Sequence, residues 1–377
     1  MKITRIETIP IRVPLNPDLA IKSGRGGMHI VSPFLIVKIH TDAGLIGLGE
    51  VSCTPRWSGE DQTTAAHFIN TQFAPAMIGH DPTAIESITQ TVFRTVAGNY
   101  FTKSGIEMAL WDLAGKAAGK PVYELLGGKV RDYVATKWSV SGQPPEMAAE
   151  IARWAMAKGF EKMKVKVGLG VESDYARVAA VRAVIGPEMK LGVDANGGWP
   201  DPATAIAAIT KLRELNIYFA EQPIPAGDPA DMAQVRNAFL QRDPLPIIAD
   251  ESLYSLSDAH MLARNKACDV FSIYIGKAGG IGPARAIADF ALSQGIACTI
   301  GSNLELSVAS AAMTHLGLAH RGITPDTYPC DIIGPFYYED DIVKAPLTIA
   351  PGAARASDKP GLGVELDDEK IEMYRVE

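Results

Sequence analysis

The arrangement of apolar and polar residues changes along the chain, which begins with short apolar runs separated by turns. Residues 3–13, 34–40 and 45–51 are rich in apolar and β-branched residues, and the Asp-Ala-Gly segment at 42–44 is typical of a hairpin turn. We therefore expect the N-terminal part to start with an antiparallel meander of three strands.

Helical periodicity follows this meander. Apolar residues between 106 and 117 recur at the spacing of one helix face. Ser104 precedes this stripe and Glu107 comes three residues later, which is the pattern of a capping box, so we expect the helix to begin at Ser104. We expect it to end at Gly119, because glycine followed closely by proline stops a helix.

From about Tyr133 short apolar strands alternate with alanine-rich amphipathic helices, as in repeated βα units around a parallel sheet. A Rossmann sheet normally uses about six such strands, whereas this chain offers seven good ones and a weak eighth, which favours a (β/α)₈ barrel. The predicted strands are residues 134–140, 163–167, 190–193, 217–220, 247–249, 270–275, 297–300 and a weak one near Ile323.

Charged residues occur where five successive predicted strands end, and they recur about every 27 to 30 residues, or one βα unit. The carboxyl ends of barrel strands surround one mouth, so we expect these side chains to lie together although they are distant in sequence. They are Lys164, Lys166, Asp194, Glu221, Asp250 and Lys277.

The three carboxylates among them, Asp194, Glu221 and Asp250, suit a hard ion that prefers oxygen ligands. Because no Cys or His accompanies them, Mg²⁺ is favoured over Zn²⁺, and Mn²⁺ is an acceptable substitute. We therefore predict a magnesium site at the mouth of the barrel.

The lysines provide acid/base groups. Lys164 and Lys166 alternate with apolar residues on one predicted strand, so they point into the barrel if the apolar face packs on the helices. Removal of a proton beside a carboxylate requires a base and positive charge that stabilises the enediolate. We assign Lys166 to proton transfer and Lys164 to tuning its pKa and orientation, with Lys277 facing the site from the sixth strand.

Composition and charge exclude several other classes. Hydrophobic residues make up 47% of the 377 residues, which is ordinary for a folded protein of more than one domain. The formal net charge of -7 and the absence of clustered Lys or Arg argue against nucleic acid and anionic membranes. No signal peptide or membrane span is evident, so we expect a cytoplasmic protein. The four cysteines are far apart in sequence and are predicted to be buried reduced thiols.

The motifs together resemble the enolase superfamily, in its muconate-lactonizing branch, over nearly the whole chain. Lys164-Val165-Lys166 resembles the Lys-x-Lys of that branch, and residues 277–280 (Lys-Ala-Gly-Gly) resemble its second lysine. Residues 194–196, 221–223 and 249–252 resemble its metal-ligand strands. Mandelate racemase-like members carry a His-Asp pair in place of the second lysine, and no histidine of this chain occupies that position.

The resemblance implies a modified TIM barrel of the (β/α)₇β type with an α+β capping domain. We expect the capping domain at residues 1–128, the barrel at 129–335, and a C-terminal segment at 336–377 that packs on the capping domain. The family often forms symmetric dimers or octamers, so a homo-oligomer is expected, with a small carboxylate as substrate and neither nucleic acid nor membrane as partner.

The resemblance also gives candidate substrate contacts. A loop at residues 21–31 folds over the site in such enzymes, which makes Arg25 a candidate for a distal carboxylate. The other candidates follow the third, fifth, seventh and eighth strands and are Asn196, Glu251, Glu305 and Asp331. Asp331 stands where muconate cycloisomerases have Glu, which allows a different acid to be bound.

Four functions are compatible with these residues. The first choice is a muconate-type cycloisomerase in which Lys166 delivers a proton to the enolate. The second is a racemase or epimerase of N-substituted amino acids, dipeptides or betaines, in which Lys166 and Lys277 act on opposite faces. The third is a dehydratase or succinylbenzoate-type synthase, and the fourth is a relative that has lost catalysis.

Overall fold

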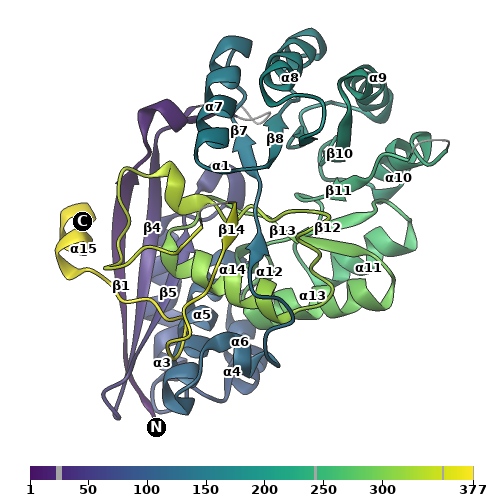
Figure 1. Ribbon diagram of the computed structural model, residues 1–377. Coiled ribbons are helices and arrows are strands. Elements are labelled where there is room, and N and C mark those ends of the chain that lie inside the picture. The colour runs from purple at the N-terminus through teal and green to yellow at the C-terminus, as the bar shows by residue number, and fades with distance from the viewer. Residues whose placement is uncertain (23–27, 242–243, 350–351, 377) are drawn as a thin grey trace.

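Two sheets organise the chain, a three-stranded antiparallel sheet and a curved seven-stranded parallel sheet (Figure 1). The computed structural model describes residues 1–22, 28–241, 244–349 and 352–376. Arg25 therefore lies outside the described residues. Within the described ranges, no helix combines the length and the apolar character needed to cross a membrane.

The antiparallel sheet is the predicted meander, with the strand order β1-β4-β5. Alternate residues of β4 face opposite sides: Phe34 and Ile36 pack in the core shared with the barrel, whereas Leu35 and Val37 pack in a separate core beneath the N-terminal helices. Both faces of the sheet are thus covered. Its strands are β1 (Ile3–Pro14), β4 (Val31–Thr41) and β5 (Ile46–Ser52), and a short hairpin consists of β2 (Ile21–Lys22) and β3 (Met28–His29).

Helices follow the meander as expected, but the longest one begins earlier than predicted. They are α1 (Pro55–Ser58), α2 (Gln62–Phe68), the π-helix η2 (Ile69–Phe73), α3 (Ala74–Met77), α4 (Ile85–Thr91), the 3₁₀-helix η3 (Val92–Thr95), α5 (Tyr100–Ala118) and α6 (Val122–Leu125).

The predicted capping box at the start of this long helix, α5, is wrong. Ser104 is buried inside the helix, and the distant Glu60 accepts hydrogen bonds from the backbone N–H groups of Phe101 (2.9 Å) and Thr102 (2.8 Å). A carboxylate from another segment therefore supplies the cap, which local sequence spacing does not reveal. The predicted end is correct, because Gly119 is the C-cap with φ of 66°.

The parallel sheet has the order β13-β12-β11-β10-β9-β8-β7, so each strand lies beside the next one in sequence, as in a barrel. Its strands are β7 (Trp138–Val140), β8 (Lys162–Lys166), β9 (Lys190–Asp194), β10 (Ile217–Glu221), β11 (Ile247–Ala249), β12 (Val270–Ile273) and β13 (Ala297–Ile300).

Helices cover the outer face of this sheet (Figure 1). They are α7 (Pro145–Ala157), α8 (Val171–Ile185), α9 (Pro202–Leu212) with η4 (Arg213–Leu215), α10 (Pro229–Ala238), α11 (Leu256–Arg264), α13 (Ile281–Ser293) and α14 (Ser307–Ala319). The single-turn α12 (Ile275–Ala278) instead follows β12 and packs on α5.

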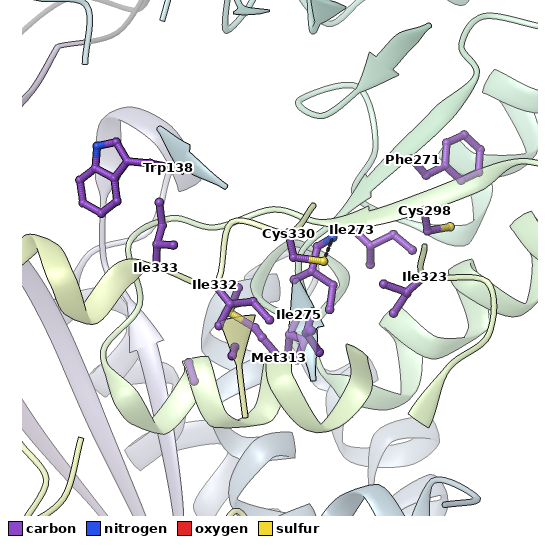
Figure 2. Packing of buried hydrophobic residues seen from close by; sticks show 14 of the residues in the cluster. Trp138, Phe271, Ile273, Ile275, Cys298, Met313, Ile323, Cys330, Ile332 and Ile333 are labelled. Atoms are coloured by element: carbon purple, nitrogen blue, oxygen red, sulfur yellow. Dashed lines mark hydrogen bonds between the residues drawn. The ribbon is translucent and has the colours of Figure 1, made fainter. Parts of the chain in front are cut away.

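A segment at residues 323–333, which turns at 325–328, closes the gap between the last and first barrel strands without forming a regular strand. Ile323 forms a parallel bridge with Cys298 of β13, and Cys330 forms one with Thr136 just before β7. Figure 2 shows this segment among the buried apolar side chains, with Ile332 near Met313 of α14. The doubtful eighth strand of the sequence is thus an irregular closure.

Residues after 333 return to the N-terminal part of the chain. The backbone N–H of Val376 donates to the carbonyl of Pro10 (3.0 Å), and α15 lies beside β1 (Figure 1). The elements in and around this segment are η5 (Gly334–Tyr337), β14 (Ala353–Ala354), which pairs with β6 (Val134–Ala135), and α15 (Asp368–Tyr374); η1 (Pro17–Leu19) precedes β2. The domain boundaries at 128 and 335 stay a prediction.

All four cysteines are buried and free of disulfides, as expected.

Two carboxylates of the N-terminal region cap barrel helices. Glu107 of α5 accepts hydrogen bonds from the backbone N–H groups of Ile281 (2.7 Å) and Gly282 (2.8 Å) at the start of α13. Glu50 of β5 accepts them from Leu306 (2.8 Å) and Ala309 (3.1 Å) at the start of α14.

Helix N-termini carry unsatisfied N–H groups, so these contacts fasten the two parts of the molecule together. Gly280 lets Glu107 approach, because a Cβ at this position would lie 2.5 Å from the Glu107 Cδ and its φ is +142°.

Candidate active site

The register of the parallel sheet brings the predicted charged residues to one edge. Lys166 of β8 pairs with Asp194 of β9, and Asp194 pairs with Glu221 of β10. Asp250 directly follows β11, the next strand in the sheet. The C-terminal ends of four neighbouring strands thus present one lysine and three carboxylates side by side, and each of these carboxylates is almost completely buried.

Lys164 lies at the centre of this group. Its Nζ contacts the Glu221 carboxylate (3.1 and 3.0 Å), Asp194 Oδ2 (3.1 Å) and Asp331 Oδ2 (2.9 Å), and the residue is 2% exposed. Burial alone would lower the pKa of Lys164, but Asp331, Glu221 and Asp194 together raise it well above its usual range. Lys164 therefore stays protonated and holds three carboxylates in place.

Lys166 lies nearer to the mouth. Its Nζ contacts Asp194 Oδ2 (2.7 Å) and Asn196 Oδ1 (2.9 Å). Burial alone would raise the pKa of Asp194, but the ammonium groups of Lys166 and Lys164 hold it well below its usual range. The Nδ2 of Asn196 also donates to Glu251 Oε1 (3.1 Å), so two of the predicted substrate contacts adjoin the Lys166 group.

Lys277 occupies the opposite side of the carboxylates. It lies in the single-turn helix α12 and not on the sixth strand, because β12 ends at Ile273. Its Nζ contacts Asp250 Oδ1 (2.5 Å) and the Asp250 carbonyl (2.7 Å), and it is 1% exposed. The hydroxyl of Tyr274 donates to Asp250 Oδ2 (2.7 Å), so both oxygens of this carboxylate are engaged.

Aromatic rings that the sequence analysis did not single out surround Lys277. Its Nζ is 3.9 Å from the ring centroid of Tyr274, 5.7 Å from that of Tyr254 and 5.8 Å from that of Trp57. Trp57 belongs to α1 of the N-terminal region and stacks on Tyr274, with centroids 5.2 Å apart. These residues follow strands or lie in short helices, so no periodic pattern marks them.

The predicted metal ligands are of the right chemical type, but each one is engaged by the chain itself. Asp194, Glu221 and Asp250 supply only oxygen atoms, and each contacts a lysine ammonium. Within the described ranges, no three His, Cys, Asp or Glu side chains converge on one point as metal ligands do. The donor set fits Mg²⁺. Both oxygens of Glu221 contact Lys164, whereas Asp194 Oδ1 accepts from the backbone N–H of Asn196 and Asp250 Oδ2 accepts from the Tyr274 hydroxyl.

The remaining predicted substrate contacts have partners within the protein. Glu305 accepts hydrogen bonds from the Ser302 hydroxyl (2.5 Å) and the Asn303 backbone N–H (2.9 Å), and burial raises its pKa. Asp331 lies on the closing segment, where its Oδ2 meets both Lys164 (2.9 Å) and Lys137 (3.1 Å).

Lys137 is a buried lysine of the site that the sequence analysis missed. It is 1% exposed, and its Nζ contacts the Pro329 carbonyl (2.6 Å) as well as Asp331. In the sequence, Lys137 could have been recognised as a lysine within the predicted apolar strand at 134–140.

Comparison with known protein families covers most of the chain. Residues 6–127 match the family described as mandelate racemase / muconate lactonizing enzyme, N-terminal domain, and residues 146–370 match the family described as enolase C-terminal domain-like. Both parts of the chain therefore match the domains of one enzyme family.

Individual relatives match over their full length. The N-succinyl-L-Arg/Lys racemase of Bacillus cereus is 34% identical over 376 residues, which are 100% of this chain and 98% of that protein. Its crystal structure superposes with a TM-score of 0.93, covering 100% of this chain and 99% of that one.

Two further solved structures differ in chemistry from that racemase. The muconate lactonizing enzyme from Pseudomonas fluorescens, complexed with muconolactone, is 30% identical with a TM-score of 0.93, covering 99% of each chain. A dipeptide epimerase from Enterococcus faecalis, complexed with Mg and the dipeptide L-Leu-L-Tyr, is 30% identical with a TM-score of 0.90, covering 97% of this chain and all of that one. The matched relatives thus include a racemase, a lactonizing enzyme and an epimerase.

Proposed function

Because the chain belongs to the mandelate racemase and muconate lactonizing enzyme family of the enolase superfamily, we propose that it is a Mg²⁺-dependent isomerase that moves protons at the carbon beside a substrate carboxylate. The observation that carries this proposal is the placement of Lys166 and Lys277. Lys166 lies on β8 and contacts Asp194, whereas Lys277 follows β12 and contacts Asp250. Strands β9, β10 and β11 lie between β8 and β12 in the sheet. An acid/base group thus stands on each side of the carboxylates.

Asp194, Glu221 and Asp250 are the residues that would hold the ion, which supplies positive charge beside the substrate carboxylate when bound. Magnesium in the matched dipeptide epimerase supports this assignment. Lys164 keeps the carboxylates in position, and Lys166 and Lys277 remove or deliver a proton from opposite faces.

Two opposed lysines support a racemase or epimerase, because inversion at a carbon needs a base on one face and an acid on the other. Asp331 already faces the ammonium groups of Lys137 and Lys164, which favours a substrate whose nitrogen carries no free ammonium. We therefore propose an N-acylated amino acid as substrate. The full-length similarity to an N-succinyl amino acid racemase supports this choice.

The second candidate is a muconate-type cycloisomerase. Lys166 alone delivers a proton after ring closure in that reaction, and the muconate lactonizing enzyme superposes as well as the racemase does. A dehydratase or succinylbenzoate-type synthase also needs one lysine only. These reactions differ from racemisation in whether Lys277 is required.

The test is NMR in D₂O with Mg²⁺, using both enantiomers of N-acyl amino acids, with dipeptides, betaines and cis,cis-muconate in separate tubes. Deuterium is expected at the α-carbon from either enantiomer. Lys166→Ala and Lys277→Ala should each slow exchange from one enantiomer by about 10²- to 10⁴-fold, the usual contribution of a general acid or base.

Other outcomes decide between the candidates. Conversion of muconate to a lactone without α-exchange of the amino-acid substrates would establish the cycloisomerase. Retention of full turnover in Lys277→Ala would contradict the two-base assignment, and the absence of exchange in every amino-acid tube would contradict the proposed substrate class.

A further inference from the structure

Five charged side chains of alternating sign connect the start of the barrel to the proposed acid/base lysine of the second strand. Lys137 Nζ lies 3.1 Å from Asp331 Oδ2, and Lys164 Nζ lies 2.9 Å from the same oxygen. Lys164 Nζ is also 3.1 Å from Asp194 Oδ2, which is in turn 2.7 Å from Lys166 Nζ. Side-chain exposure rises to 13% only at Lys166, so the rest of this charged chain is buried.

Lys137 is firmly held at the buried end of the charged chain. Its Nζ donates to the Pro329 carbonyl (2.6 Å), and its backbone N–H donates to the Cys330 carbonyl (3.0 Å). Burial of an ammonium group is unfavourable unless it is paired, and Asp331 provides the opposite charge. Lys137 and Asp331 therefore fix each other, one beside the first strand and the other on the closing segment.

From this geometry we propose that Lys137 is a positioning residue for Lys166, acting through Asp331, Lys164 and Asp194. The inference rests on the proposed function, in which Lys166 transfers the proton.

Shared oxygens carry the effect along the charged chain. Asp331 Oδ2 is divided between Lys137 and Lys164, so loss of Lys137 leaves this carboxylate to Lys164 alone and draws that ammonium toward the closing segment. Asp194 Oδ2 is likewise divided between Lys164 and Lys166, so a shift of Lys164 changes the direction in which Asp194 holds Lys166.

Lys277 provides an internal reference. Its ammonium contacts Asp250, the Ser272 carbonyl (3.2 Å) and the Tyr274 ring, none of which belongs to the charged chain. Lys164 also contacts Glu221 (3.0 Å), so a change at Lys137 should affect the Lys166 face more strongly than the Lys277 face.

The experiment compares Lys137→Met with wild type and with Lys162→Met. Lys162 is the control, because this lysine of β8 lies outside the charged chain, with its Nζ 3.4 Å from the Asp326 carbonyl. Deuterium exchange is measured separately from each enantiomer, and Lys166→Ala and Lys277→Ala show which enantiomer reports on which lysine. Lys137→Met should slow exchange on the Lys166 face by about 10- to 100-fold, as loss of a supporting shell does, and on the Lys277 face by less than about threefold.

A double variant tests the route. If Lys137 acts through Asp331, then adding Lys137→Met to Asp331→Asn should slow the Lys166 face by less than about threefold further. This pair also removes both buried charges, which protects the test if Lys137→Met alone fails to fold. Equal losses on both faces together with a lower Tm would show a merely structural role and overturn the proposal, as would unchanged exchange.

A readout without turnover separates this inference from the proposed function. Crystal structures of wild type and Lys137→Met should differ in the Lys166–Asp194 contact, while the Lys277–Asp250 contact is kept. If no substrate undergoes exchange with wild type, the proposed function fails and these two contacts alone decide the role of Lys137; an unchanged Lys166–Asp194 contact would then overturn it.

Discussion

The two proposed acid/base lysines are held in different ways. Lys166 ends a chain of alternating charges that lies entirely within the barrel and its closing segment. Lys277 instead lies beneath three aromatic rings, of which Trp57 comes from the N-terminal region. The helix that follows Lys277 is also capped from that region, by Glu107.

In the proposed reaction, this difference predicts which part of the protein acts on each face of the substrate. The environment of Lys166 is set by ion pairs between barrel strands, whereas that of Lys277 depends on how the N-terminal region sits on the barrel. Substitutions in the N-terminal region should therefore affect Lys277 first, and substitutions at the buried charges should affect Lys166 first.

The largest effect is expected from a substitution that impairs proton exchange on both faces of the substrate. Glu221 lies on β10, between β9, which carries Asp194, and β11, which precedes Asp250, so Glu221→Gln removes the central one of the three proposed metal ligands. Exchange from both enantiomers should fall below detection and Mg²⁺ affinity measured by calorimetry should drop, with the circular dichroism spectrum unchanged. Exposed Glu188→Gln is the control. Near-normal turnover in Glu221→Gln would contradict the metal assignment.

A substitution beside Lys277 should have a smaller effect, which distinguishes the Lys277 face from the Lys166 face. Trp57→Leu removes a ring that stacks on Tyr274 and covers Lys277. Because a desolvated cation–π contact contributes up to about 2 kcal/mol, exchange on the Lys277 face should slow by about tenfold, with little change on the Lys166 face. Trp57→Phe keeps an aromatic ring and should lie closer to wild type. Equal slowing on both faces would show that the N-terminal region does not act on Lys277 selectively.

The smallest effect is expected at Glu107, which caps α13, the helix that follows Lys277. Burial raises the pKa of Glu107 to about 7, against 4.5 in its ordinary state. A folded-state pKa above the unfolded value means that this stabilising contribution is complete below about pH 4.5 and is lost as the pH rises through about 7. Glu107→Gln cannot ionise, so its Tm relative to wild type should improve from pH 5 to pH 8.5 by a few degrees.

The pH trend is the test of that prediction, because loss of one hydrogen bond in Glu107→Gln lowers the Tm equally at every pH. The same scan with Glu188→Gln should show no trend. A constant difference in Tm between Glu107→Gln and wild type would mean that the cap does not titrate in this range.

The barrel strands and the ends that carry the lysines and carboxylates were predictable from the sequence, because a buried parallel strand is a short apolar run and a polar residue at its end is conspicuous. The strand at Ile247–Ala249 coincides with β11, and the alternation around Lys164 and Lys166 placed both lysines inside the barrel. These signals are local, so one sequence is enough to recognise them.

The residues that were missed depend on distant contacts. The predicted strand at 134–140 is broken into β6 and β7, and Lys137 lies at the break, where strand alternation does not define the direction of a side chain. The start of α5 is set by Glu60, about forty residues earlier in the chain. Trp57 and Tyr274 meet only after the two parts of the molecule pack together.

The helix caps that Glu50 and Glu107 provide have a consequence for folding during synthesis. Both residues are synthesised before residue 129, and the helices α13 and α14 that they cap are synthesised after the other barrel helices. Since chains fold from the N-terminus during synthesis, the closing part of the barrel forms on a template that already exists. A barrel cut away from that template loses the carboxylate acceptors for the starts of two helices, α13 and α14.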